Sequence, residues 1–119
     1  MAKSRRPRRG EVWGVRFDPS VGAEIRKIRP AVVLNVDSIG RLALRIVVPI
    51  TDWRPALASL PWFVPLPTTI ENGLTKDSGA DAFQVKSVSE DRFVRFLGSI
   101  APAQVDEIAA AVALCIGKP

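Results

Sequence analysis

The sequence predicts an α+β domain that is mainly β, a small antiparallel barrel with an amphipathic helix at its carboxyl end. Two observations predict this class. Most apolar residues alternate with polar ones or form short runs that end at Pro, Gly or Asp, which is typical of strands. Only the segment after Pro102 has apolar residues at helical spacing. With 119 residues the chain is expected to form one domain, residues 10–119, around a single core.

The first two strands are expected at residues 11–17 and 30–36. Residues 11–17 (EVWGVRF) alternate as a half-buried strand does, and the Asp-Pro-Ser at 18–20 ends the pattern. Residues 30–36 (PAVVLNV) are almost continuously apolar, which indicates a central strand covered on both faces. Pro30 cannot donate a hydrogen bond to a neighbouring strand, so it is expected at the first residue of this one.

The strands after residue 40 are expected on the same grounds. Residues 41–50 (RLALRIVVPI) have an apolar side chain at every second position. The stretch 51–67 contains four prolines, which exclude a long helix and favour a loop followed by an edge strand near 62–66. Three further elements are expected: strands at 81–88 and 92–100 and, between them, a short helical turn at 89–91.

The carboxyl end is expected to form a helix. Pro102 suits the first helical turn, and Gly117 suits the position just after the last one. Asp106 and Glu107 lie near the positive end of the helix dipole. One apolar stripe has the spacing of a helix face that packs on a core, formed by Val105, Ile108, Ala109, Val112 and Ile116.

The net charge of +5 comes from the amino terminus. Residues 1–10 contain five of the 17 basic residues and no acidic one, which leaves 12 basic and 12 acidic residues in the rest of the chain. We expect residues 1–9 to be a flexible basic arm, which either holds RNA or DNA by its phosphates or only aids solubility. Any specific site must therefore come from local clustering within the domain itself.

The composition also excludes several classes of function. The chain has no histidine, which excludes His-dependent catalytic triads and His metal ligands. Its single cysteine, Cys115, cannot form an internal disulfide, which favours a cytoplasmic location, and it is too few for a zinc site. No apolar run approaches the roughly 20 residues of a membrane span. Magnesium bound by carboxylates stays open, although no D-x-D-type group marks a site. We expect no metal, no cofactor and no membrane partner.

A group of charged residues just before the second strand is the first candidate site. The segment GAEIRKIRP contains Glu24, Arg26, Lys27 and Arg29. Arg29 stands at the start of a buried strand, and its guanidinium offers a rigid fork of donors that matches phosphate oxygens. The alternative is an exposed ion pair between Arg29 and Glu24, which would contribute little to stability.

Residues near other strand ends form a second group of candidates. Thr51 follows the third strand and could donate its hydroxyl to a phosphoryl oxygen or bond a neighbouring backbone group. Trp53 and Arg54 place an aromatic ring beside a cation, as on a base-stacking platform, although Trp53 could equally fill the core. Three more side chains either contact phosphate or are simply solvated: Lys76, Gln84 and Lys86.

Four segments resemble the MazF/PemK family of toxin–antitoxin ribonucleases, from about Gly10 to Gly117. They are GEVWGVRFDPSVGAEIRKIRPAVVLN, VVPITD, NGLTKDSGADAFQVKS and LGSIAPAQVDEIAAAVALCIG. The motifs G-x-[VI]-W, R-P-[AV]-[VL]-[VI] and V-P-x-T are specific in this order and spacing. The resemblance implies a small SH3-like antiparallel barrel of the PemK/CcdB-like type, with a C-terminal amphipathic helix, that works as a homodimer.

The resemblance also implies an activity and the residues that carry it. The family cleaves single-stranded RNA without a metal, within a short preferred sequence. Its catalytic pair, the Arg of the R-P motif and the Thr of V-P-x-T, corresponds to Arg29 and Thr51, and the acid of the preceding loop falls on Glu24. The implied partner is an antitoxin whose acidic tail competes with RNA for this surface. Contacts to RNA are expected from Arg26, Lys27, Trp53, Arg54, Lys76, Gln84 and Lys86.

One departure from the family pattern concerns proton transfer. Many relatives have Asp directly before the residue that corresponds to Gln84, whereas this chain has Phe83. Asp81 lies two residues earlier, ~7 Å away along an extended strand, and is not expected to replace it. The expected chemistry is attack by the RNA's own 2′-hydroxyl, with Arg29 stabilising charge and Glu24 or water moving protons.

Two other functions are open on sequence alone. The domain could bind nucleic acid without cutting it, with Arg29 and Thr51 in structural roles. It could also resemble a gyrase-poisoning toxin of the same barrel. That class depends on a Trp-Gly-Ile-type tail, and this chain ends in ALCIGKP.

Overall fold

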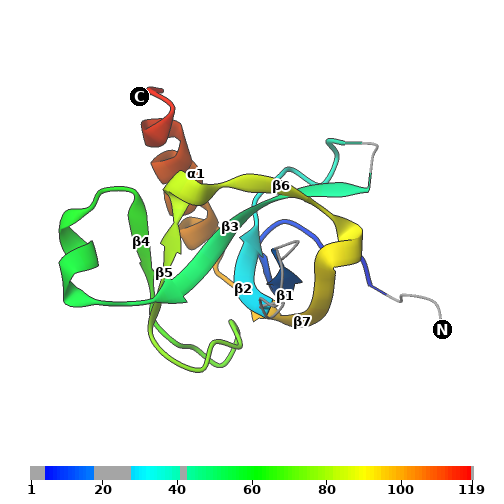
Figure 1. Ribbon diagram of the computed structural model, residues 1–119, viewed down its shortest axis with the longest axis horizontal. Helices are drawn as coiled ribbons and strands as arrows, with labels where there is room; N and C mark the ends of the chain where they lie inside the picture. Colours follow the sequence, from blue (N-terminus) through cyan, green and yellow to red (C-terminus); the bar gives the residue numbers. More distant parts are fainter. Residues whose placement is uncertain (1–4, 18–27, 41–42, 119) are drawn as a thin grey trace, which may run out of the picture.

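The computed structural model describes residues 5–17, 28–40 and 43–118. In this part of the chain, strands are followed by one α-helix, with single 3-10 turns between some of them (Figure 1). The elements in chain order are β1 (Glu11–Arg16), β2 (Ile28–Val33), β3 (Leu44–Asp52), η1 (Pro55–Ser59), β4 (Phe63–Leu66), β5 (Ser78–Asp81), η2 (Ala82–Gln84), β6 (Lys86–Ser89), η3 (Glu90–Arg92), β7 (Phe93–Ser99) and α1 (Pro102–Cys115).

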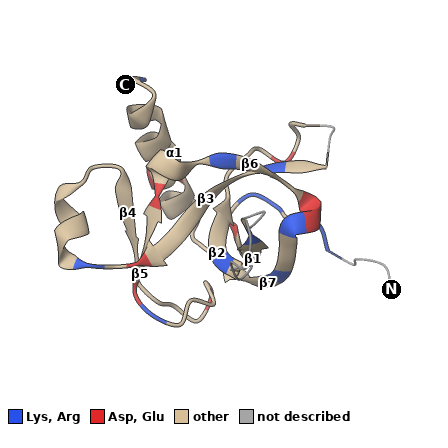
Figure 2. Cartoon of the chain, viewed as in Figure 1, with Lys and Arg blue, Asp and Glu red and all other residues tan. Residues whose placement is uncertain are grey.

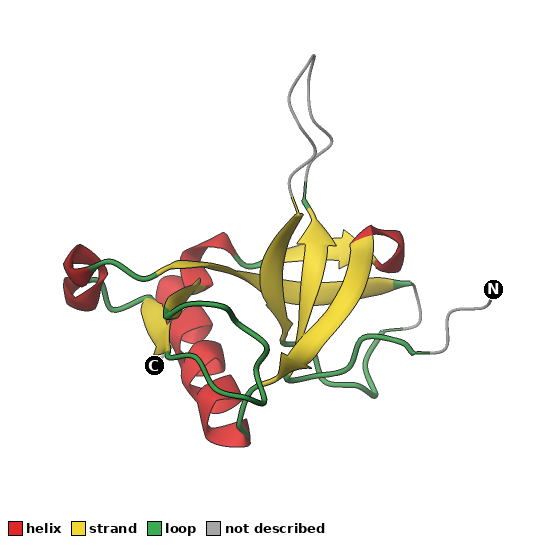
Figure 3. Ribbon diagram, turned by 90° about the horizontal axis from the view of Figure 1, so that it is seen from below, coloured by secondary structure: helices red, strands yellow, loops and turns green. Residues whose placement is uncertain are grey.

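The strands form one antiparallel sheet in the order β4-β5-β3-β2-β1-β7, and β6 also pairs with β3. The expected class, a mainly β domain of antiparallel strands with one C-terminal helix, is confirmed. The sheet is not closed, because β4 and β7 end it without pairing with each other. The helix fills the open side instead: its Ile108 packs in one cluster with Val12 near one end of the sheet and Val64 at the other. Figure 3 shows the helix lying along the sheet beside β4 and β5.

The central strands separate two hydrophobic clusters. Val32 and Val48 belong to the larger one under the helix, whereas their neighbours Ala31, Val33 and Val47 belong to the smaller one on the opposite face. All five side chains are fully buried. The expectation that the second strand is covered on both faces is therefore confirmed, and β2 and β3 form a rigid base for residues at their ends.

The expected strand at 81–88 was wrong, because the chain turns in its middle. β5 ends at Asp81, the 3-10 turn η2 covers Ala82–Gln84, and β6 begins at Lys86. The Asp81 carboxylate accepts a hydrogen bond from the backbone N–H of Phe83 at 3.2 Å, which caps the turn. As a result the Phe83 side chain is 69% exposed. The other predicted elements are present, with ends shifted by up to three residues.

Residues 5–9, which we expected to belong to a flexible arm, lie against the sheet. The Pro7 side chain is fully buried. Arg5 pairs with the buried carboxylate of Glu11 at 2.8 Å. Part of the positive charge of this segment is therefore balanced by an acidic residue of the domain. Residues 1–4 lie outside the described residues.

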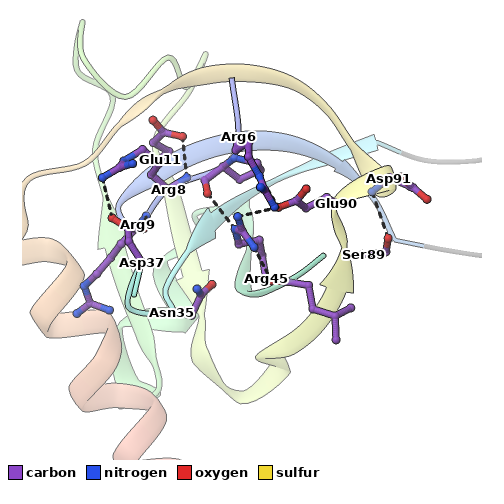
Figure 4. A network of polar contacts seen from close by, with 12 residues as sticks. Arg6, Arg8, Arg9, Glu11, Asn35, Asp37, Arg45, Ser89, Glu90 and Asp91 are labelled. Carbon is purple, nitrogen blue, oxygen red and sulfur yellow. Dashed lines mark hydrogen bonds and ion pairs between the residues drawn. The ribbon is translucent and has the colours of Figure 1, made fainter. Parts of the chain in front are cut away.

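Glu90 joins this segment to the sheet. Its carboxylate lies 2.8 Å from the guanidinium of Arg6 and 2.7 Å from that of Arg45, and Figure 4 shows both arginines converging on it. The side chains of Glu90 and Arg45 are both only 14% exposed. A largely buried carboxylate between two cations is costly to remove, because both cations lose their partner.

We therefore predict that Glu90→Gln lowers the free energy of unfolding by about 1–3 kcal/mol, measured by urea denaturation. The matched control is Glu71→Gln, at an exposed carboxylate that joins no ion pair among the described residues and should change stability by less than about 0.5 kcal/mol. Equal stability of the two variants would show that the Glu90 pairs contribute nothing.

Candidate active site

A cleft of about 430 Å³ crosses the carboxyl-terminal half of β3. Two other strands lie along one edge of β3: β6 pairs with its first half, up to Val47, and β5 with its last part, from Ile50. The η2 turn fills the interval between them. The polar and charged side chains that line the cleft come from β2, β3, the loop after β3, β5, η2 and β6: Arg29, Thr51, Asp52, Arg54, Asp81, Gln84 and Lys86.

Arg29 and Thr51 are brought together by the pairing of β2 with β3. The two strands are antiparallel, the last pair between them is Ala31 with Pro49, and Arg29 and Thr51 each lie two residues beyond that pair. Positions two apart on a strand share a face, so both side chains can reach the same space. Both residues line the cleft. The expected catalytic pair therefore lines one cleft, although 21 residues separate the two in sequence.

The two side chains are available for a ligand as far as the structure describes their surroundings. Arg29 is exposed and takes part in none of the ion pairs found among the described residues. The expected alternative partner, Glu24, lies outside the described residues, as do Arg26 and Lys27. Within the described residues, the Thr51 hydroxyl makes no hydrogen bond to a backbone group. The arrangement thus offers a charged fork and a neutral hydroxyl donor at one point.

The far wall of the cleft carries Gln84 and Lys86. The Lys86 ammonium lies 4.9 Å from the centroid of the Phe17 ring, which also lines the cleft. Figure 2 shows basic positions on β2 and on β6, and these two strands pair with opposite edges of β3. A polyanionic chain lying across the end of β3 would therefore meet a cation on each side. This geometry suits consecutive phosphates better than a single small anion.

Two expected contact residues lie elsewhere. The Trp53 ring packs on β5, where a Cβ added at Gly79 would come within 2.7 Å of its Cε3 atom, and Trp53 does not line the cleft. The Lys76 ammonium lies 3.2 Å from the Asp52 carboxylate and lines a second groove. Arg54 does line the cleft, from the loop after β3.

Sequence reasoning missed Asp81 as part of the cleft. An extended strand would have carried its carboxylate away from Gln84, but the η2 turn brings the two side chains to 2.7 Å. The available signal was local. An Asp side chain commonly accepts a hydrogen bond from the backbone N–H two residues later, and this forms a turn. In the described parts of the chain, no group of three or more Asp, Glu, His or Cys could hold a metal ion.

The structure is thus a small β-rich domain whose cleft is lined by three cationic side chains, Arg29, Arg54 and Lys86, and by the hydroxyl-bearing Thr51. Comparison with known proteins identifies its family: residues 8–116 match the model of the PemK-like, MazF-like toxins of type II toxin–antitoxin systems. The chain belongs to this family, as expected from the sequence.

None of the helices in the described residues is long and apolar enough to span a membrane.

Named relatives support the assignment. The chain is 34% identical over 113 residues to the endoribonuclease MazF9 of Mycobacterium tuberculosis, covering 90% of this chain and 93% of that protein. A MazE–MazF complex from Deinococcus radiodurans has a similar fold, with TM-score 0.79 at 22% identity over 98% of this chain and 100% of that one. A mycobacterial endoribonuclease solved with its cognate antitoxin gives 0.73 at 21% identity, over 95% and 97% of the two chains.

Proposed function

We propose that this toxin is an endoribonuclease that cleaves single-stranded RNA within a short preferred sequence. The observation that carries the proposal is the convergence of Arg29 and Thr51 in one cleft, with Lys86 on the opposite wall. The 34% identical relative is named as an endoribonuclease. Single-stranded RNA fits because unstacked bases can splay over an open cleft, whereas the edges of paired bases are hidden in a duplex.

The proposed reaction uses the substrate's own nucleophile. The 2′-hydroxyl oxygen attacks the adjacent phosphorus, a bond from phosphorus to that oxygen forms, and the bond from phosphorus to the 5′-oxygen breaks. The products are a 2′,3′-cyclic phosphate and a 5′-hydroxyl end. One proton leaves the 2′-hydroxyl, to Glu24 or water, and one proton reaches the departing 5′-oxygen, so no metal or redox partner is consumed.

The cleft residues would act on the charge that develops at phosphorus. Arg29 donates to the non-bridging oxygens as they gain charge in the five-coordinate transition state, and donors of this kind can be worth about 3–4 kcal/mol each. Thr51 adds a neutral donor to the same oxygens. Arg54 and Lys86 hold the neighbouring phosphates, which keeps the attacking and leaving oxygens in line. Arg26 and Lys27 would extend this contact along the RNA.

The proposed partners follow from the same surface. A disordered acidic segment of a cognate antitoxin would occupy the cationic cleft and exclude RNA, since it offers carboxylates to the same donors. Relatives of this fold have been solved with their antitoxins. We further propose that the toxin works as a homodimer in the cytoplasm, where mRNA is available.

The test is incubation of the pure protein with a long RNA in excess EDTA, followed by analysis of the new ends. Cleavage at a recurring short sequence, with 5′-hydroxyl ends that a kinase can label directly, supports the proposal. Binding without cleavage would identify a non-catalytic RNA-binding domain instead. Cleavage that stops when the metal is chelated would contradict the reaction given above.

A further inference from the structure

Asp81 is a buried carboxylate in the cleft that the proposed reaction does not use. The residue is only 8% exposed, although it lines the cleft. Both of its oxygens accept hydrogen bonds: Oδ1 from the backbone N–H of Phe83 at 3.2 Å, and Oδ2 from the side-chain Nε2 of Gln84 at 2.7 Å. Both carboxylate oxygens therefore have a donor within the protein. One donor belongs to Gln84, an exposed side chain that lines the same cleft.

The bond to Asp81 fixes which end of the Gln84 amide faces the substrate. An ionised carboxylate can only accept, so Gln84 must turn Nε2 toward Asp81 and leave its carbonyl oxygen Oε1 free. The alternative rotamer would place two oxygens against each other. The turn itself is held firmly, since Ala82 is fully buried in the main core and η2 packs against α1.

We propose that Asp81 is a positioning residue that sets the base preference of the cleft through Gln84. With Oε1 exposed, Gln84 accepts a hydrogen bond from the amino group at C6 of adenine or C4 of cytosine, where guanine and uracil carry a carbonyl oxygen. Adenine or cytosine is therefore favoured over guanine or uracil at one position of the cleaved sequence. This inference rests on the proposed endoribonuclease function. It concerns which RNA is cut, whereas Arg29 and Thr51 concern the cutting itself.

The Asp81→Asn variant tests the proposal because it should reverse the amide. The backbone N–H of Phe83 still needs an acceptor, so the oxygen of the new asparagine stays there and its amino group faces Gln84. Gln84 must then turn Oε1 toward residue 81 and present Nε2, a donor, to the RNA. The preference at that one position should change by about tenfold, from adenine or cytosine to guanine or uracil. The other positions should be unchanged.

A charge-matched second change should restore the original preference. In Asp81→Asn/Gln84→Glu the new carboxylate accepts from the asparagine amino group with one oxygen and exposes the other oxygen, again an acceptor. The pair keeps one negative charge, as in the natural protein. A second single variant is Gln84→Ala, which removes the amide itself and should remove the preference at this position only.

The experiment is cleavage of a randomised single-stranded RNA pool, with sequencing from the 5′-hydroxyl ends. Asp91→Asn, an exposed Asp in η3, is the control and should cut the natural sequence. A reversed preference in Asp81→Asn that returns in the double variant supports the proposal. It is overturned if Asp81→Asn or Gln84→Ala keeps the natural preference, or if folded Asp81→Asn cuts no sequence at all. Failure of the natural protein to cut any RNA would instead refute the proposed function.

Discussion

Arg29→Ala is expected to lower the rate of RNA cleavage by at least about 100-fold, with binding of RNA reduced far less. Arg29 is the charged donor that β2 contributes to the cleft, and in the proposed reaction its contribution grows as negative charge develops on the phosphoryl oxygens. Binding is shared with Arg54 and Lys86, which line the same cleft. The loss should therefore fall mainly on the rate at saturating RNA.

The control for this result is a variant of a second arginine on the sheet. Arg95 is an exposed residue of β7 that lines a different groove, so Arg95→Ala should cleave at nearly the natural rate. Arg29→Lys keeps the charge and loses the fork, and it should retain part of the activity if charge is the main contribution. Equal rates for Arg29→Ala and Arg95→Ala in single-turnover cleavage would remove Arg29 from the mechanism.

A large loss of stability is expected from Gly98→Ala in β7. A Cβ added at Gly98 would lie 2.1 Å from the carbonyl oxygen of Glu71 and 2.6 Å from the carbonyl carbon of Asn72. Both are backbone atoms, and they cannot move aside easily because the buried Asn72 side chain holds its turn by hydrogen bonds to Thr69, Leu74 and Pro67. We expect the free energy of unfolding to fall by more than about 3 kcal/mol.

Gly14→Ala is the matched control for this prediction. It lies in the adjacent strand β1, and the one tight contact of a Cβ there is with the Cγ2 atom of Ile28 at 3.1 Å, a methyl group that can shift. Two atoms of Arg95, at 3.8 and 3.9 Å, lie at ordinary contact distance. Urea denaturation should show a loss of less than about 1.5 kcal/mol for Gly14→Ala. Similar stability of the two variants would mean that the turn at Asn72 is not packed against β7 as described.

Sequence reasoning found the elements whose signal is local. The alternation in β1 and β3 and the apolar run in β2 reflect burial of one or both faces, and the helix was marked by Pro102 and its stripe. Openness of the sheet could not be read in this way, because it depends on where the helix packs. The position of residues 5–9 on the sheet was also missed. It depends on contacts between residues distant in sequence, such as the ion pair of Arg6 with Glu90.

The candidate site was predictable in its parts and not in its assembly. Arg29 and Thr51 were recognised by residue type, by position at strand ends and by resemblance to a family, but only the pairing of β2 with β3 brings both to one cleft. The role of Asp81 was hidden because the pattern of 81–88 resembled a continuous strand. Trp53 illustrates the reverse: its neighbours suggested a stacking platform, and the absence of a side chain at Gly79 gives the ring a place on the sheet.

The central claim is that this cleft uses the substrate's own 2′-hydroxyl to break the phosphodiester bond. The most direct measurement compares two oligonucleotides of the preferred sequence, one all RNA and one with a single 2′-deoxy nucleotide on the 5′ side of the cut. We predict that both bind with similar affinity and that only the RNA is cleaved. Cleavage of the deoxy-substituted strand at the same bond and a comparable rate would contradict the account.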